Sequence, residues 1–490
     1  MKRAAALLAL SALTACSMDP HYVRPTPAVP PSFPQGGAYA QQNEAPLPSV
    51  SYRDIFRDAR LQAIVEQALA NNQDLRQALA NIQSARALYR VQRADIFPAI
   101  DASAGVTTRR GSTPGGTNTG TGGTTNGGTS GHDTVTTYDL QAGTTAWEID
   151  LFGRLQSLSR SAFNQYLATD AAARATRLTL VSDIADAWLQ LAADRSLLLI
   201  AEDTEKSAQT SVDLTQKRLD GGVAPRTDLR QAQTVLATAQ ADHARQMTLV
   251  AQDINALQLL VGAPVADTLL PTTIEDADGK LAELPAGLDS TILLRRPDVV
   301  EAEYQLRASN ARIGAARAAF FPRISLTAVA GLASTALSSL FTGGAFAWTV
   351  APSATLPIFD GGANAGNLAY AKAQREAYLA AYQKAIQTAF REVSDALARR
   401  GTIDAETQAD QLNATAAEDT LNLDIARYRQ GIDPYLNTLD AQRTFYAARQ
   451  TVVNIRLTRA QNLVDLYQTL GGDQLVQAMP PPPLPGSARK

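Results

Sequence analysis

Four segments of the chain alternate hydrophobic and polar residues with a period of two. In one of them, Ile324, Leu326 and Ala328 alternate with Ser325 and Thr327. This period places successive side chains on opposite faces of a β-strand, and each segment has at least the roughly 9–11 residues that a tilted transmembrane strand requires. A half-buried strand of a soluble sheet would show the same alternation. The four predicted strands cover about 99–110, 135–152, 323–333 and 345–359.

The arrangement of these strands favours a membrane. The strands form two pairs, and the connection within the first pair, 110–133, consists almost entirely of Gly, Thr, Asn and Ser, as expected for a long exposed loop. Four strands cannot close a membrane barrel, because an open edge leaves backbone groups unsatisfied in hydrocarbon and such barrels begin at about eight strands. Two chains would supply about eight strands and three about twelve. Because side chains fill an eight-stranded interior, a conducting barrel favours a trimer.

Most of the remaining chain has the three-and-four spacing of helices, for example at Leu379, Tyr382 and Ile386. Two long stretches, 163–219 and 367–400, contain neither proline nor glycine. A helix of about 55 residues is on the order of 80 Å long, whereas an ordinary globular helix has about three or four turns. The pattern therefore predicts long helices with coiled-coil-like packing.

A glycine-containing turn ends each of these long helices. Gly221 and Gly222 follow the first, and Gly431 and Asp433 lie in the second turn. Glycine is favoured there because it adopts the left-handed conformation of a helix cap. Another helical pattern begins after each turn, which predicts two helical hairpins. Their tips are expected near 220–226 and 430–434.

The same order of motifs occurs twice in the chain. Ile96-Phe97-Pro98 corresponds to Phe320-Phe321-Pro322, and each is followed by an alternating segment. Leu151-Phe152-Gly153 likewise corresponds to Ile358-Phe359-Asp360-Gly361. Such self-similarity indicates one architectural unit built twice. We expect each repeat to contain a helix, a strand pair and a long helical hairpin, the first repeat over 58–290 and the second over 291–474.

The N-terminus has the features of a secreted lipoprotein. Met1-Lys2-Arg3 precedes an apolar stretch that is typical of a signal peptide and too short to span a bilayer as a helix. Leu13-Thr14-Ala15-Cys16 resembles a bacterial lipobox, so we expect a signal peptide over 1–15 and palmitate on Cys16. An ordinary signal peptide with a chance cysteine is the alternative. Ser17 follows instead of aspartate, which by analogy with bacterial lipoproteins favours the outer membrane.

Proline-rich segments flank the predicted repeats. Residues 20–34 are rich in proline and cannot form regular helix or a central strand. We expect 16–57 to be an extended arm that leads from the lipid to the body of the protein. The last segment, 475–490, is expected to be a flexible tail for the same compositional reason.

Composition excludes several classes of function. The formal net charge is −3 and becomes more negative once Lys2 and Arg3 are removed, which argues against a nucleic-acid partner. The histidines, His21, His132 and His243, do not cluster in the sequence. Metal-ligand spacing, a Gly-x-Ser-x-Gly elbow and a phosphate-binding loop are all missing from the sequence. We therefore expect neither an enzyme nor a cofactor-binding protein.

Several motifs resemble one family, the TolC-type outer-membrane efflux channels, and in particular the NodT-like lipoproteins that serve resistance-nodulation-division pumps. The most specific is Leu294-Arg295-Arg296-Pro297-Asp298-Val299-Val300-Glu301-Ala302-Glu303; Leu439-Asp440-Ala441-Gln442-Arg443 and Leu470-Gly471-Gly472 also match. The resemblance covers essentially the whole chain after the leader. It implies a mixed fold: four strands per chain in a shared twelve-stranded β-barrel of a homotrimer, with a long periplasmic α-helical barrel.

The resemblance also implies a gate at the periplasmic end of the tunnel. Leu436 would form an apolar constriction, Asp440 a ring of carboxylates, and Arg443 would hold that ring by hydrogen bonds. Asn437 departs from relatives that carry a second aspartate. The alternative is that Asp440 and Arg443 form an ordinary surface pair on one helix, worth roughly 0.2–0.5 kcal/mol. The helix tips at Gly221, Gly222, Gly431 and Asp433 would dock a periplasmic adaptor.

Two functions remain open on these grounds. The first is a passive trimeric duct in the outer membrane of a Gram-negative bacterium, which exports drugs or other small molecules for an adaptor and an inner-membrane pump. The second is a structural periplasmic coiled-coil lipoprotein without a pore. The paired alternating strands favour the first.

Overall fold

A computed structural model describes residues 17–39, 51–112, 132–282 and 290–472. The chain divides into two compact units. Unit 1 consists of Met1–Val23, Ala85–Tyr166 and Gln305–Tyr378; unit 2 consists of Arg24–Ser84, Leu167–Tyr304 and Leu379–Lys490. Each unit therefore takes segments from both halves of the sequence. Cys16 and the tail after Gly472 lie outside the described residues.

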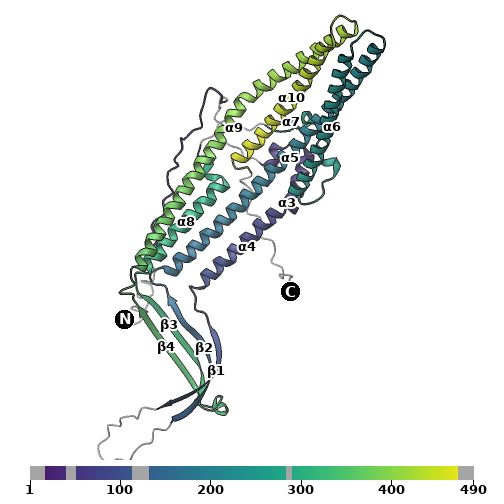
Figure 1. Cartoon of the computed structure of the whole chain (residues 1–490). Coiled ribbons are helices and arrows are strands. Elements are labelled where there is room, and N and C mark those ends of the chain that lie inside the picture. The colour runs from purple at the N-terminus through teal and green to yellow at the C-terminus, as the bar shows by residue number, and fades with distance from the viewer. Residues whose placement is uncertain (1–16, 40–50, 113–131, 283–289, 473–490) are drawn as a thin grey trace, which may run out of the picture. The chain divides into compact units, whose positions relative to one another are not determined.

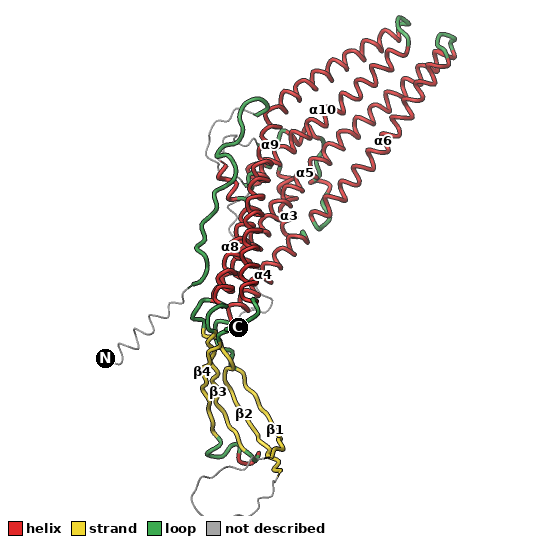
Figure 2. The backbone as a smooth tube through the Cα atoms, turned by 60° about the vertical axis from the view of Figure 1, so that its left-hand side comes forward, coloured by secondary structure: helices red, strands yellow, loops and turns green. Residues whose placement is uncertain are grey.

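Unit 1 contains a four-stranded antiparallel sheet in the order β1-β2-β3-β4, with β1 and β4 at its edges. Figures 1 and 2 show the four strands side by side. The strands are β1 (Asp101–Ser112), β2 (His132–Ile149), β3 (Arg323–Ser334) and β4 (Phe346–Thr355). The pairing of β2 with β3 joins the two halves of the chain.

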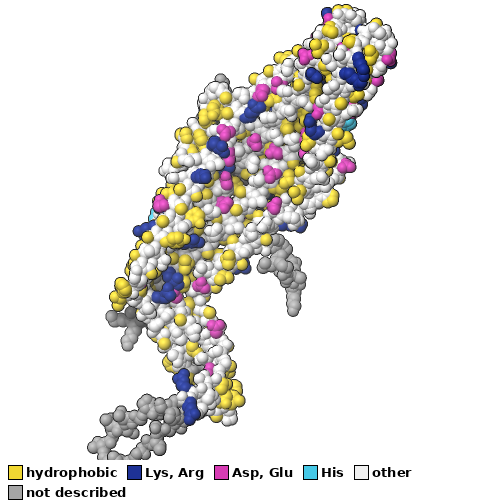
Figure 3. Space-filling model, in the orientation of Figure 1, with side chains coloured by type: hydrophobic (Ala, Val, Ile, Leu, Met, Phe, Trp, Pro, Cys, Tyr) yellow, Lys and Arg dark blue, Asp and Glu magenta, His cyan; other side chains and the backbone are white. Residues whose placement is uncertain are grey.

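Strand register gathers the apolar positions on one face of the sheet. Leu140 pairs with Ala104 on one side and with Leu332 on the other, and Leu332 in turn pairs with Phe346. The opposite face carries small and polar residues, such as Gln141, which lies between Ser103 and Gly331. The apolar face is open in the single chain: the Trp348 side chain is 67% exposed. Figure 3 shows hydrophobic side chains gathered over the β3–β4 connection.

One feature of the sheet differs from the predicted alternation. The regular period of two would place Ala146 on the apolar face, but the register between β2 and β3 shifts between Thr144 and Trp147. Ala146 adopts a positive φ of 55° there. A β-bulge of this kind inserts one extra residue, so the side-chain parity reverses. Trp147, opposite Leu326, and not Ala146 therefore continues the apolar face.

Helices form most of the remaining described chain. Figure 1 shows two helical hairpins, α5–α6 and α9–α10, whose tips belong to unit 2 and lie at the same end. The α-helices are α2 (Tyr52–Ile55), α3 (Ala59–Asn71), α4 (Gln73–Ala94), α5 (Arg154–Asp220), α6 (Arg226–Val261), α7 (Ile274–Asp278), α8 (Pro297–Ala318), α9 (Ala363–Arg429) and α10 (Tyr435–Thr469). Short 3-10 turns cover η1 (Asp267–Leu269), η2 (Ser290–Arg295) and η3 (Leu337–Ser339).

Helix lengths repeat between the two halves. Helices α4 and α8 each have 22 residues, and α5 and α9 each have 67. Helices α6 and α10 have 36 and 35. This equality confirms that one architectural unit is built twice.

The long helices extend further than the stretches without glycine. Helix α9 continues past the exposed Gly401 to Arg429. A glycine inside a helix costs roughly 0.5–1 kcal/mol relative to alanine. Burial of neighbouring side chains such as Leu397 and Ile403 outweighs that penalty.

The N-terminal arm is held against the helices by hydrogen bonds and an ion pair. In unit 1 the Asp19 carboxylate accepts hydrogen bonds from Ser157 and Arg160 and lies directly over Gly314 of α8. The Pro20 carbonyl accepts a hydrogen bond from Asn310, which precedes Gly314 by one turn of α8. In unit 2, Arg24 pairs with Glu303 at 2.7 Å. Extended proline-rich backbone leaves its carbonyls unpaired, and the helix side chains satisfy them.

Part of the predicted arm is helical. Residues 52–55 form the single turn α2, because the Ser51 side chain and the Asp54 side chain cap the turn reciprocally. Phe33 is buried and stacks on Phe390, with ring centroids 5.1 Å apart, which fixes the arm within unit 2. Among the described residues, no helix is both long and apolar enough to cross a bilayer.

Candidate functional site

Both helical hairpins of unit 2 reverse through the same turn. Gly222 and Gly431 have positive φ values of 72° and 76°. Val223 donates to the carbonyl of Arg218, and Ile432 donates to the carbonyl of Arg427. These are the hydrogen bonds of a Schellman cap, which ends a helix with a left-handed glycine. Each following helix, α6 and α10, begins directly after a proline whose fixed φ suits a helix start.

The other two predicted tip residues have different roles in the turns. Gly221 is not among the glycines with positive φ, so the left-handed cap depends on Gly222 alone. The Asp433 carboxylate forms an ion pair with Arg427 across the second turn, and this pair lowers the pKa of Asp433. The four tip residues thus lie in two matching turns.

A buried aromatic cluster supports the second tip. Tyr428, Tyr435, Leu439 and Ala232 pack together, and the two tyrosine rings lie 5.4 Å apart. The Arg218 guanidinium lies over the Tyr428 ring at 4.5 Å and donates to the Tyr428 carbonyl at 2.7 Å. Burial raises the pKa of Tyr435 to about 12. The cluster joins the tips of the two hairpins, because Arg218 and Ala232 belong to the first.

The first turns of α10 separate a buried face from an exposed face. Tyr435, Thr438 and Leu439 are buried. Leu436 is 58% exposed, and Asn437, Asp440 and Arg443 are exposed as well. Residues that are three or four positions apart share a face of a helix. The structure therefore brings the three predicted gate residues, Leu436, Asp440 and Arg443, onto one exposed face of α10.

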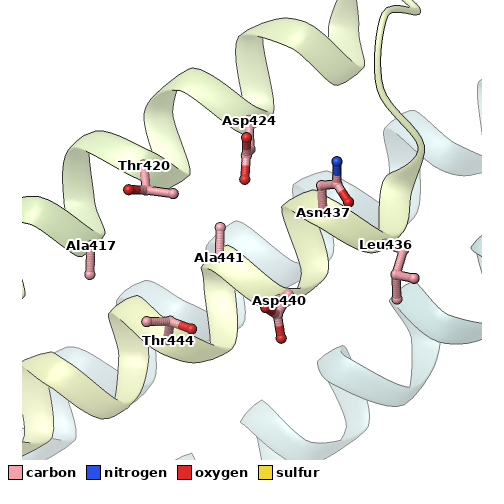
Figure 4. A pocket seen from close by; sticks show the side chains of 8 residues that line it. All are labelled: Ala417, Thr420, Asp424, Leu436, Asn437, Asp440, Ala441 and Thr444. Atoms are coloured by element: carbon pink, nitrogen blue, oxygen red, sulfur yellow. The ribbon is translucent and has the colours of Figure 1, made fainter.

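A groove of about 460 Å³ lies between α9 and α10 beside this face. Figure 4 shows Asp424 and Ala441 directed toward one another across the groove, while Asp440 and Leu436 point away from α9. The groove is lined by Ala417, Thr420 and Asp424 of α9 and by Leu436, Asn437, Asp440, Ala441 and Thr444 of α10.

Asp424 was not singled out from the sequence, although it adds a second carboxylate to the groove. The sequence does contain a signal that could have identified Asp424. In an antiparallel helical hairpin, residues at equal distances from the turn lie opposite each other, and Ile432 is midway between Asp424 and Asp440. Thr438 donates to the Asp424 carbonyl at 3.3 Å, which holds the two helices in this register.

The predicted gate residues make no ion pair with each other in the single chain. Among the residues that the structure describes, neither Asp440 nor Arg443 has an oppositely charged partner within 4.0 Å.

A second cavity of about 590 Å³ lies among α5, α7, α9 and α10 of unit 2. Its walls carry both signs of charge: Arg449 lies 3.4 Å from Asp203, and Arg456 lies 3.5 Å from Glu275. Phe445 contributes an aromatic face to Arg449. Sequence reasoning did not identify this cavity, because its residues come from four separate helices.

Two carboxyl groups of unit 2 are held partly out of water. Burial, with added repulsion from Asp465 and Asp183, raises the pKa of Asp186 to about 7. Burial and the adjacent Asp194 likewise raise the pKa of Asp253. Removal from water disfavours the ionised form of a carboxyl group. These groups lie inside the helix packing and not in either cavity.

The described residues hold no cluster of three or more His, Cys, Asp or Glu side chains with metal-binding geometry. His243 contacts Glu205 at 2.7 Å, and Glu202 lies 3.8 Å away, so all three groups belong to one half-buried contact between α5 and α6. His21 lies in the arm, far from His243 in the sequence, and His132 begins β2.

Comparison with known sequences identifies the family. A model of the outer membrane efflux protein family matches residues 64–263 and 288–472. The chain is 41% identical to the probable efflux pump outer membrane protein TtgC of Pseudomonas putida over 94% of this chain and 93% of TtgC. It is 39% identical to the outer membrane protein OprJ of Pseudomonas aeruginosa over 95% of each chain.

Solved structures lead to the same family. A membrane protein from Pseudomonas aeruginosa is 36% identical with a TM-score of 0.83, and the match covers 94% of this chain and all of that one. The open state of the MtrE outer membrane channel of Neisseria gonorrhoeae is 33% identical with a TM-score of 0.81, and the match covers 94% and 99%. The predicted mixed fold of a TolC-type channel, with four strands and long helices in each chain, is confirmed. The structural lipoprotein without a pore is set aside. The chain belongs to the outer membrane efflux protein family, and it is the outer-membrane channel of an efflux system, not an enzyme.

Proposed function

We propose that three copies of the chain form one passive duct, in which their sheets join edge to edge into a twelve-stranded barrel. One observation carries this proposal: the sheet has an apolar face and two unpaired edge strands, β1 and β4. Each unpaired backbone group costs several kcal/mol in hydrocarbon, and only closure removes the edges. Three four-stranded sheets give a barrel of about twelve strands, which leaves room for an aqueous lumen. The polar face of each sheet would line it.

The groove end of unit 2 would close this duct on the periplasmic side. The exposed face of α10 carries Leu436, Asp440 and Arg443. None of these three side chains is buried within the chain. In a symmetric assembly the three copies of this face would approach each other. Asp440 of one copy would then pair with Arg443 of the next, and Leu436 would narrow the passage.

The helix tips would dock a periplasmic adaptor that links the duct to an inner-membrane pump of the resistance-nodulation-division type. Two matching turns at Gly222 and Gly431 support this, because they present similar surfaces at the same end of the hairpins. Gly221 and Asp433 flank these turns. Repeated tips in three copies would offer about six similar docking positions around the duct, three from each repeat.

Palmitate on Cys16 would tether the chain to the lipid of the outer membrane. The arm supports this role, because Ser17 and Asp19 are already fixed to Arg160 directly after the modified position. The cargo would be small organic molecules. Relatives named for antibiotic, toluene and solvent efflux support that class.

The decisive experiment measures current through the purified protein in planar bilayers, together with its mass in detergent by light scattering. We expect three chains per particle and discrete conductance steps. A particle of three chains that never conducts, even when the gate residues are replaced by alanine, would contradict the duct. A detergent-purified protein that remains monomeric would contradict the shared barrel.

A further inference from the structure

An aromatic contact joins the two repeats within the chain. Phe152 follows β2, and Phe321 precedes β3; their rings stack with centroids 4.8 Å apart and an interplanar angle of 19°. Both residues belong to unit 1. The contact lies at the end of the β2–β3 pairing, where Ile149 is opposite Ile324. It is thus the point at which the first strand pair meets the second.

Each of these two residues has a counterpart in the other repeat. Phe359 follows β4 as Phe152 follows β2, in the corresponding segment Ile358-Phe359-Asp360-Gly361. Phe97 precedes β1 as Phe321 precedes β3, in the corresponding segment Ile96-Phe97-Pro98. The counterparts do not meet in the chain, because β1 and β4 are the opposite edges of the sheet.

Both counterparts are open to solvent. Phe359 is 91% exposed and Phe97 is 61% exposed. Their neighbours Ile358 and Ile100 are more than three-quarters exposed as well. A phenylalanine buries 150–250 Å² in a typical core, and contiguous exposed apolar residues mark interaction surfaces. Each edge of unit 1 therefore presents half of an aromatic contact.

We infer that Phe359 of one copy stacks on Phe97 of the next copy, so that the contact made by Phe152 and Phe321 is repeated between chains. The inference rests on the proposed assembly and names the residues that join its copies. The argument is one of repetition: if β4 pairs with β1 of the next copy as β2 pairs with β3, the flanking aromatic residues are brought together in the same way. The occupant of this surface is a second copy of the chain.

The two contacts differ in charge. Beside Phe152 and Phe321, Arg323 lies 3.4 Å from Glu148. The corresponding residues near Phe97 and Phe359 are Ala99 and Thr355, which carry no charge. The contact between copies therefore lacks this ion pair, and raising the salt concentration should weaken it less than it weakens a contact held by paired charges, since screening acts only on charges.

Disulfide cross-linking tests the contact, because Cys16 is the single native cysteine. The variant Phe97→Cys with Phe359→Cys should give covalent trimers on oxidation, seen on a non-reducing denaturing gel. The matched control, Phe152→Cys with Phe321→Cys, should form its bond within one chain and migrate as a monomer. The parent chain, with Cys16 alone, should show neither product.

The test separates this inference from the proposed assembly. The mass of the unoxidised parent in detergent reports the assembly itself. If the parent is a trimer and the control pair oxidises, while the Phe97→Cys and Phe359→Cys chain stays monomeric on the gel, the contact is wrong and the assembly stands. If the parent is a monomer, the assembly is wrong.

A second probe avoids the loss of the aromatic rings. A photoreactive benzoyl-phenylalanine at position 359 keeps an aromatic side chain in place. On irradiation it should capture residues 96–100 of another copy, identified by mass spectrometry of chains that carry two different tags. Capture confined to residues of its own chain would overturn the inference.

Discussion

Helices α4 and α8 each contain 22 residues and occupy corresponding places in the two repeats, yet they are buried very differently. Helix α8 buries seven apolar residues, among them Val299, Leu306 and Ile313, and carries the N-terminal arm. In α4 only Leu75 is buried, and Leu88 and Val91 face solvent. Two helices in corresponding places therefore have different surroundings: α8 contacts the arm and, through Arg312 and Ser161, helix α5 of the first repeat, whereas most of α4 is exposed.

The long helices show the same contrast at single residues. Asp186 of α5 is largely buried, whereas its counterpart in α9, Asp395, is exposed. At the tips, the gate residues of α10 correspond to uncharged residues of α6. Asp440 matches Gln231 and Arg443 matches Thr234. The charged residues of the proposed periplasmic gate thus come from the second repeat alone, and the corresponding positions of the first repeat are uncharged.

The gate offers the largest test of this contrast. Asp440→Ala with Arg443→Ala should raise uptake of bulky antibiotics about tenfold, because losing roughly 1.4 kcal/mol of closure multiplies the open population by ten. Uptake is measured in cells that lack other porins for these drugs. The matched variant of the first repeat, Gln231→Ala with Thr234→Ala, should leave uptake unchanged. Equal uptake in the two variants would remove the distinction between the tips.

The buried carboxyl group gives the next largest effect. Asp186 keeps its proton in the folded chain up to about pH 7, but the unfolded chain loses it near pH 3.8. The folded state therefore binds more protons between these values, so stability falls as pH rises through this window and is lowest above it. Asp186→Asn should stabilise the protein by roughly 2–4 kcal/mol at pH 8 and by less at pH 5.

Thermal unfolding at a fixed scan rate measures this difference. The control is Asp395→Asn at the exposed position of the second repeat, which should shift the midpoint little at either pH. A larger shift for Asp395→Asn than for Asp186→Asn would mean that the two repeats are not buried as described.

The contact between the N-terminal arm and α8 should have a smaller effect on stability. A side chain at Gly314 would place its Cβ 1.7 Å from the Asp19 carboxylate, so Gly314→Ala must displace the arm. We expect a loss of about 1–3 kcal/mol, although helix propensity alone predicts a gain of about 1 kcal/mol. Faster proteolysis of the arm and a lower unfolding midpoint would report it.

Gly366→Ala in α9 is the matched control, because a Cβ there meets nothing within 4 Å. It should be neutral or slightly stabilising. If both substitutions stabilise the protein equally, the arm does not hold α8.

The lipid anchor should have the smallest effect on the assembly. On the proposed assembly and lipid anchor, Cys16→Ser should abolish palmitate labelling but leave trimers in the outer membrane, because the closed barrel would hold them there without the lipid. Radiolabelled palmitate and membrane fractionation measure the two outcomes separately. If the trimers are lost from the membrane when the lipid is absent, anchoring by the barrel is wrong.

Much of this protein is determined by local sequence. Alternation at Leu326 and Ala328 specifies which face of a strand is apolar, and the glycines at 222 and 431 specify where each hairpin turns. Two copies of each motif predicted that the chain is built from two similar repeats. These features follow from side-chain spacing and turn chemistry within a few residues, so no distant partner is needed to read them.

Other features were decided only by the tertiary structure. The bulge at Ala146 depends on how β2 meets β3, and the position of Asp19 depends on the missing side chain of Gly314. The raised pKa of Asp186 depends on burial and on Asp465, which the packing of α10 brings close to α5. Asp424 lies in the groove between α9 and α10, across from Ala441, because the hairpin brings these two helices together. Each of these requires segments that are far apart in the chain to come together, and side-chain periodicity within one segment carries no information about which other segment it will meet.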